Sequence, residues 1–215
     1  MTYTAEQIEL QETQGRRRLG ERMAFIIADV ISGDQREFIE SRDEFYLATV
    51  DADGNPSVSY KGGDVGVVRV LDERTLVFPS YDGNGMYWST GNIAATGSIG
   101  LLFIDHVTPN RLRVQADAVI DRDADLVASY PGAEFVVRCT VRQVFPNCAR
   151  YVHRYERVGR SKYVPDADGE QPAPAWKRVD AFQDVLSDDE RAATDAAGGV
   201  IDVDEYRHRL ATGES

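Results

Sequence analysis

Short stretches in which apolar and polar residues alternate dominate the middle of the chain. Alternation with a period of two is typical of strands that bury one face. Turn-forming sequences such as DADGN and DERT separate the stretches, as in β-hairpins. Strands this short and numerous predict an antiparallel barrel or sandwich, mainly β with peripheral helices (α+β), rather than a doubly wound sheet. The predicted strand regions are residues 45–50, 57–61, 66–80 (a hairpin), 98–105, 111–120 and 134–145.

Three other stretches have helical periodicity. Residues 5–31 carry apolar residues at helical spacing as far as a break at Ser32-Gly33. A short helix over residues 35–41 is expected to start at Asp34 as N-cap and to bury Phe38 and Ile39. The third stretch, residues 86–97, is bounded and interrupted by glycines.

A chain of 215 residues is long enough for one ordinary core. The pattern therefore predicts a single domain in three parts. N-terminal helices (residues 1–43) pack on the barrel, and residues 44–146 form the barrel core. Residues 147–215 form an arm and an acidic tail that wrap the barrel, because this stretch has too few apolar residues for a core of its own.

Composition narrows the classes of partner. The net charge of −12, from 24 basic and 36 acidic residues, disfavours binding to nucleic acid or to an anionic membrane surface. The first residues do not resemble a secretory signal, so a cytoplasmic protein is expected. Cys139 and Cys148 are expected to be reduced thiols, and three scattered histidines predict no metal site.

A Gly/Asn-rich turn before the third helical stretch is the main candidate for chemistry. Asn84, Gly85 and Met86 occupy this turn, where free backbone N–H groups and the positive end of a helix dipole attract a phosphate. The first hairpin, residues 45–61, places polar side chains on one face of its second strand, so that two hydroxyls and an ammonium converge on one anion. These side chains are Ser57, Ser59 and Lys61; an exposed edge lysine is the alternative for Lys61.

Several motifs in this region occur together in one known family. They are FYLATVDADGNP at 45–56, KGG at 61–63, VLDERTL at 70–76, GNGMYWSTGNI at 83–93, NC at 147–148 and PAWKR at 174–178. In this combination the sequence resembles the pyridoxamine 5′-phosphate oxidase-like superfamily of FMN-binding split barrels. The resemblance covers most of the chain and implies an antiparallel split β-barrel that forms a homodimer, with two flavins held by residues of both subunits.

The resemblance also implies roles for individual residues. Phe78 and Ser80 would lie beside the isoalloxazine ring, with plain core as the alternative for Phe78. Arg111 would lie near the ring, where a cation stabilises reduced flavin, or would be a surface arginine of the barrel. Trp176 would lie over the flavin or anchor the arm. Relatives often carry an arginine where this chain has Gly85, so Gly85→Arg is expected to hold flavin at least as well, and Gly85→Val to lose it.

The function implied is that of an FMN-dependent oxidoreductase transferring electrons or hydride to an unidentified small molecule, with NAD(P)H as a candidate donor. Two alternatives stay open: a non-catalytic flavin- or heme-binding protein and a deazaflavin-dependent reductase. Pyridoxamine-phosphate oxidase activity itself is not expected, because the C-terminal region lacks a match to the basic substrate-binding signature. The strands that contain LLFI and VVRV are expected to contribute to the dimer interface.

Overall fold

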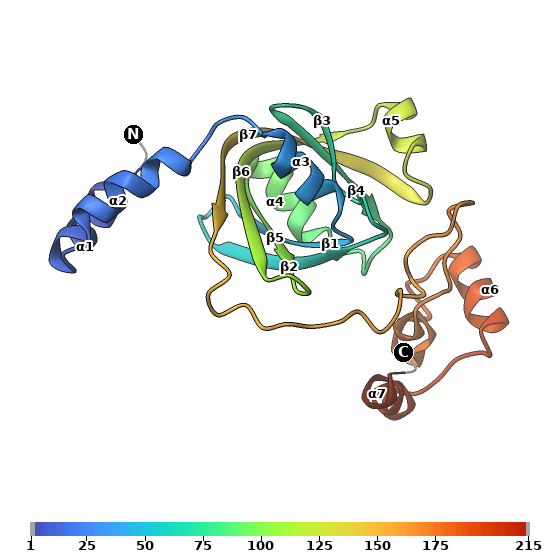
Figure 1. The fold of residues 1–215 in the computed structure, drawn as a ribbon. Helices are drawn as coiled ribbons and strands as arrows, with labels where there is room; N and C mark the ends of the chain where they lie inside the picture. Colours follow the sequence, from blue (N-terminus) through green and yellow to red (C-terminus); the bar gives the residue numbers. More distant parts are fainter. Residues whose placement is uncertain (1–2, 214–215) are drawn as a thin grey trace. The chain divides into compact units, whose positions relative to one another are not determined.

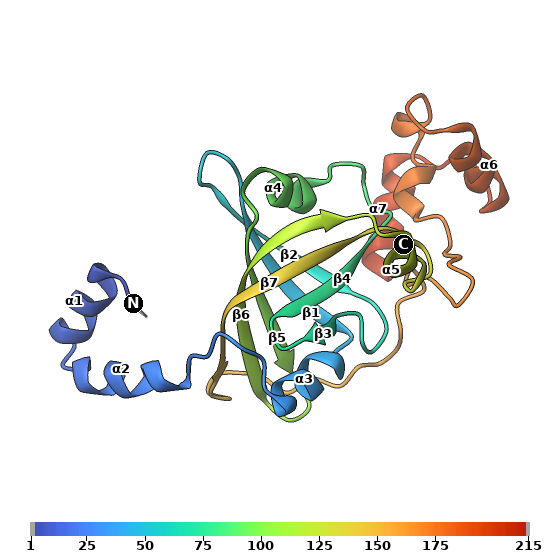
Figure 2. The same cartoon turned by 90° about the horizontal axis from the view of Figure 1, so that it is seen from above.

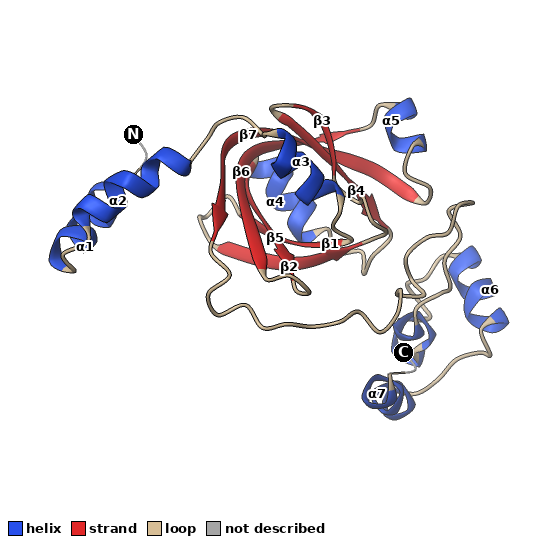
Figure 3. Ribbon diagram, viewed as in Figure 1, coloured by secondary structure: helices blue, strands red, loops and turns tan. Residues whose placement is uncertain are grey.

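The computed structural model describes residues 3–213 and contains one antiparallel sheet of seven strands in the order β2-β1-β5-β6-β7-β4-β3. The sheet curls into a barrel that stays open, because β2 and β3 are unpaired edge strands (Figures 1 and 3). The predicted antiparallel split barrel is therefore confirmed. The strands are β1 (Glu44–Val50), β2 (Pro56–Gly62), β3 (Arg69–Asp72), β4 (Thr75–Tyr81), β5 (Ser98–Asp105), β6 (Asn110–Asp121) and β7 (Ala133–Asn147).

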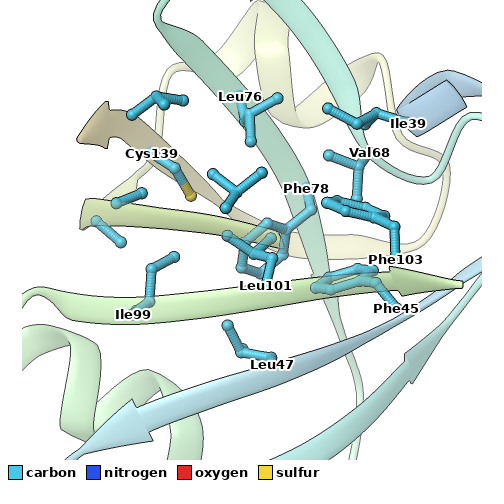
Figure 4. Packing of buried hydrophobic residues seen from close by; sticks show 14 of the residues in the cluster. Ile39, Phe45, Leu47, Val68, Leu76, Phe78, Ile99, Leu101, Phe103 and Cys139 are labelled. Atoms are coloured by element: carbon cyan, nitrogen blue, oxygen red, sulfur yellow. The ribbon is translucent and has the colours of Figure 1, made fainter. Parts of the chain in front are cut away.

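The inner face of the sheet forms the main hydrophobic core, as the alternating pattern predicts. Along β1, Phe45, Leu47 and Thr49 are buried and their neighbours are only partly buried. The ring of Phe45 meets that of Phe78 on β4 at 5.1 Å between centroids and that of Phe103 on β5 at 5.8 Å (Figure 4). The contact between Phe45 and Phe78 joins strands that are not adjacent in the sheet and so helps to hold it curled.

Two helices of the barrel lie at opposite ends of it, α3 (Gly33–Glu40) and α4 (Trp88–Thr96) (Figure 2). Helix α3 buries Ile39 completely, as predicted. Its N-cap is Ser32 and not Asp34, since Ser32 and Gln35 form a reciprocal capping box. A short helix, α5 (Ala124–Ala128), packs near β7.

The single helix predicted for residues 5–31 is wrong. The structure has α1 (Ala5–Thr13), α2 (Arg17–Met23) and a 3₁₀ turn, η1 (Ala24–Ile26). Gly15, with φ of 62°, interrupts the helix, because a left-handed residue cannot continue it. Helices α1 and α2 contain no buried residue.

The chain divides into two compact units that meet in sequence at Arg160 and Ser161. The second unit contains the 3₁₀ helices η2 (Ala175–Arg178) and η3 (Asp180–Phe182), followed by α6 (Asp188–Ala196) and α7 (Val203–Thr212). Inside this unit Lys177 is buried and its ammonium lies 3.0 Å from a carboxylate oxygen of Glu190. The predicted wrapping of residues 147–215 around the barrel stays a prediction.

Within residues 3–213, no helix has both the length and the apolar character needed to cross a membrane.

Candidate functional site

Strand β2 contributes a polar strip to the inner face of the sheet. In the register of β1 and β2, Ser57 lies opposite Thr49, Ser59 opposite Leu47 and Lys61 opposite Phe45. Directly opposed residues of antiparallel strands point to the same face, and the three β1 partners are all buried. Ser57, Ser59 and Lys61 therefore share one inward-facing strip, and each is half-buried.

Lys61 is the only cation of this strip. Across the described part of the chain, no ion pair or hydrogen bond to its ammonium is found. Burial lowers the pKa of Lys61 below the usual value for lysine, because desolvation disfavours the charged form. An ammonium in such a position is stabilised by a bound anion.

Helix α4 lies beside this strip and is fixed to β1 and β2 by three side-chain hydrogen bonds, two to β1 and one to β2. Thr96 Oγ1 donates to the carbonyl oxygen of Val50 at 2.8 Å, and Asn92 Nδ2 donates to Thr49 Oγ1 at 3.0 Å. At the other end of the helix, the hydroxyls of Ser89 and Ser59 are 3.1 Å apart.

These contacts set the direction of α4. Near its C-terminal end the helix is bonded to Val50, and one turn earlier to Thr49. Near its N-terminal end it is bonded to Ser59, which pairs with Leu47 two residues before Thr49 on β1. The next inward-facing position of β2 after Ser59 is Lys61. The N-terminus of α4 is therefore directed toward the end of the strip that carries the ammonium.

The first turn of α4 leaves backbone donors available. Its first N–H groups have no acceptor within the helix, as at every helix start, and no side chain caps them. The N-terminus also carries the positive end of the helix dipole. Ser89, whose hydroxyl meets Ser59, is only 8% exposed, so this turn lies close to the strand.

The turn before α4 differs in one respect from the prediction. Gly85 has φ of +72°, a conformation that favours glycine, and a Cβ there would meet no atom within 4 Å. The backbone N–H of Met86 donates to Asn84 Oδ1 at 3.1 Å. That amide is engaged within the turn, whereas no side chain caps the amides of the first turn of α4.

Tyr87 joins the turn to the helix, and the sequence pattern did not single it out as a site residue. It is the N-cap of α4 and has left-handed dihedral angles, φ 46° and ψ 30°. Its hydroxyl lies 3.1 and 3.3 Å from the carboxylate oxygens of Glu134 on β7, and its ring stacks on Phe135 at 6.5 Å.

Two predicted site residues lie on β4. Phe78 is 2% exposed and packs against Phe45 in the core, which agrees with the alternative of plain core. Ser80 follows on the same face and is half-buried. The structure therefore places Ser80 at the end of the apolar row and Phe78 within it.

Arg111 is not brought to the polar strip within one chain. On β6, Leu112 and Val114 are buried and point inward, and Arg111 alternates with them, so it belongs to the outer face. Its guanidinium donates to the carbonyl oxygens of Cys148 and Arg150 at 2.8 and 3.3 Å. Its Nε is buried and has no hydrogen-bond partner in the described structure.

Trp176 belongs to the second unit, where its ring meets that of Phe182 edge-on at 5.7 Å. The ammonium of Lys177 lies 5.7 Å from the same ring. His106 is half-buried: its ring lies 5.3 Å from that of Tyr155, and its Nε2 lies 3.4 Å from a carboxylate oxygen of Glu44.

The match to one protein-family model decides which family the chain belongs to. The family model described as pyridoxamine 5′-phosphate oxidase matches residues 31–208. The chain belongs to the pyridoxamine 5′-phosphate oxidase family. The family match covers β1 to β7 and continues through most of the second unit.

Solved structures give more distant likenesses. A pyridoxamine 5′-phosphate oxidase candidate from Lactobacillus delbrueckii is 30% identical, with 55% of this chain and 95% of that chain covered and a TM-score of 0.44. HupZ from Group A Streptococcus is 19% identical (59% and 99% covered, TM-score 0.46). An FMN-binding protein from Syntrophomonas wolfei is 13% identical (65% and 97% covered, TM-score 0.42). No curated protein sequence matches the chain significantly.

Proposed function

We propose that the chain binds FMN, with the flavin phosphate between Lys61 and the N-terminus of α4. The observation that carries this proposal is the direction of α4, whose first turn points along the inner strip of β2 toward an ammonium with no acidic partner among the described residues. Family membership is consistent with a flavin ligand.

The donors around this position suit a phosphate dianion. Lys61 supplies a charge-assisted bond, the serine hydroxyls of β2 supply neutral ones, and the amides of α4 add the favourable end of the helix dipole. An overall acidic chain with a net charge of −12 needs such a local cationic site to attract an anion.

We further propose that the protein is an oxidoreductase. A bound flavin supplies the electron or hydride chemistry, so the chain itself needs only to bind, orient and shield it. The acceptor would be a small molecule, with NAD(P)H as the candidate donor. This assignment needs no nucleophile–base pair from the protein.

A homodimer completes the proposal. Two apolar side chains on the outer face of edge strand β2 are conspicuously exposed, Val58 at 69% and Tyr60 at 59%, and a second copy would cover them. Of the segments expected at the interface, Leu102 and Ile104 on β5 face outward and are half-buried in the single chain. The valines of VVRV are not available, because Val67, Val68 and Val70 are buried in the core of their own chain. Outward-facing Arg111 would reach a flavin only from the partner copy.

Titration of apoprotein with FMN and with riboflavin tests the proposal. Lys61→Ala should weaken FMN binding by about 1.5 to 3 kcal/mol, or roughly ten- to a hundredfold, because one charge-assisted bond is lost. Riboflavin lacks the phosphate, so its binding should hardly change. Lys162→Ala, at an exposed lysine, is the matched control. Equal losses for both flavins would contradict a phosphate site at Lys61.

A visible spectrum of purified protein tests the redox assignment. Flavin absorbance that bleaches anaerobically on addition of NAD(P)H would support the oxidoreductase. Flavin absorbance that no donor bleaches would favour a carrier, and a Soret band would replace FMN by heme. Sedimentation of a stable monomer at micromolar concentration would contradict the homodimer.

A further inference from the structure

Tyr87 occupies an unfavourable backbone conformation. It is one of two non-glycine residues with positive φ in the described chain, the other being Tyr151 at 67°. A side chain in this region crowds its own backbone, and glycine, asparagine and aspartate usually occupy such positions. A tyrosine persists there only when its surroundings hold it.

The surroundings of Tyr87 come from a distant part of the sheet. Its hydroxyl donates to the carboxylate of Glu134, 47 residues along the chain, and its ring stacks on Phe135 with 28° between the ring planes. Both partners lie at the start of β7. Tyr87 therefore ties the residue that begins α4 to a strand that is not adjacent to β2.

Burial does not explain this arrangement. Tyr87 is 54% exposed and belongs to neither hydrophobic cluster of the described structure. The contacts of Tyr87 have a larger effect on the position of α4. With Ser89 held to Ser59 on β2 and Tyr87 held to β7, the first turn of α4 is fixed from two sides, and no side chain caps its amides.

We propose that Tyr87 is a positioning residue that directs the free amides of the first turn of α4 at the phosphate of FMN. This inference rests on the function proposed above and deepens it. The tyrosine fixes the orientation of the helix through Glu134 and Phe135 without contacting the ligand.

The test compares binding of FMN and riboflavin to the apoprotein of four variants. Tyr87→Gly keeps the left-handed conformation accessible and removes the anchor, Tyr87→Phe removes only the hydroxyl, and Glu134→Gln keeps an acceptor. Tyr151→Gly is the matched control, since Tyr151 is the other tyrosine with positive φ. Helix orientation affects donors to the phosphate, so only FMN affinity should respond.

We expect Tyr87→Gly to weaken FMN binding about tenfold while riboflavin binding is unchanged, as for loss of one to two aligned donors. Tyr87→Phe should lose about threefold. Glu134→Gln and Tyr151→Gly should bind FMN like the wild type. If Tyr87→Gly fails to fold, Tyr87→Phe decides: equal FMN affinity to the wild type would overturn the proposal.

Other outcomes separate this inference from the proposed function. Full FMN affinity in Tyr87→Gly, together with an FMN-selective loss in Lys61→Ala, overturns only the positioning role. Equal loss of FMN and riboflavin in Tyr87→Gly also overturns it, because the tyrosine would then support the ring site or the fold. If Lys61→Ala shows no FMN-selective loss, the phosphate site itself is wrong.

Discussion

Strands β2 and β4 both turn one face toward the interior of the barrel, and they fill it with opposite chemistry. On β4 the inward residues Leu76 and Phe78 belong to the hydrophobic core. On β2 the inward residues are two serines and Lys61, all half-buried. The difference shows that the interior near edge strand β2 is not built as core. An inward polar strip with an uncompensated ammonium is expected where a ligand completes the structure.

The buried residues of β4 stabilise the fold, whereas Lys61 on β2 lowers the stability of the apoprotein and serves binding. An apolar side chain at position 61 would fit its neighbour Phe45 better than a desolvated ammonium does. Sites that bind ligands often carry such a loss of stability. Substitutions on β4 and β2 should therefore differ in the sign of their effect on stability.

The largest effect is expected for Phe78→Ala on β4. Removing a buried ring that packs against Phe45 should lower the free energy of unfolding by about 3 to 5 kcal/mol, because a cavity remains in the core. Urea unfolding measures the change. Thr140→Ala, at an exposed position of β7, is the control and should change stability by less than about 0.5 kcal/mol. A small loss for Phe78→Ala would place this ring outside the core.

On β2, Lys61→Met should have the opposite effect on the apoprotein. It removes a desolvated charge, so the free energy of unfolding should rise, whereas FMN binding should weaken by about 1.5 to 3 kcal/mol. Thermal unfolding of apoprotein and flavin titration measure the two effects. Loss of stability in Lys61→Met would mean that the ammonium has a stabilising partner, and the contrast with β4 would fail.

The pH dependence of stability sharpens the same point. The pKa of Lys61 is lowered in the folded chain, so between that pKa and the ordinary value of 10.5 the unfolded chain binds more protons. Wild-type stability should therefore gain a contribution as pH rises through this range, and Lys61→Met should lack it. The difference between the two urea-unfolding profiles isolates this contribution from other titrating groups. Parallel profiles would contradict the desolvation of Lys61.

Substitutions at Gly85 test the role of the turn that leads into α4. A Cβ at this position would meet no neighbour, so the expected harm of Gly85→Val comes from φ of +72° and not from a steric block. Gly85→Ala should cost about 1 to 2 kcal/mol in the folded turn and weaken FMN binding accordingly. Gly85→Arg carries the same backbone cost, which offsets the gain predicted for its guanidinium. Gly83→Ala, also in open space but without positive φ, is the control and should bind like the wild type.

Much of the fold could be predicted because hairpin strands have a local signature. The alternation of Phe45, Leu47 and Thr49 and the turn DADGN predict both strands of the first hairpin. The division of the N-terminal region into two helices was harder to predict from the sequence. A glycine inside a periodic stretch is often tolerated, so Gly15 did not mark the break between α1 and α2.

The site was predictable only in part, since sequence spacing reports faces of a strand and not contacts between elements. The shared face of Ser57, Ser59 and Lys61 follows from a period of two. That Ser89 meets Ser59, and that Tyr87 is anchored at Glu134, depend on how α4 lies across the barrel. No local pattern encodes contacts over 30 and 47 residues.

The smallest effect concerns the hydroxyl pair that joins α4 to β2. Ser59→Ala should lower the free energy of unfolding by about 0.5 to 1.5 kcal/mol, because it removes one hydrogen bond of a nearly buried Ser89. Ser89→Ala should have a similar effect, and the double variant should lose less than the sum of the two. Ser57→Ala, on the same strip but without a side-chain hydrogen bond among the described residues, should leave stability unchanged. A double-mutant cycle in urea measures the coupling, and additive losses would mean that these hydroxyls do not hold the helix to the strand.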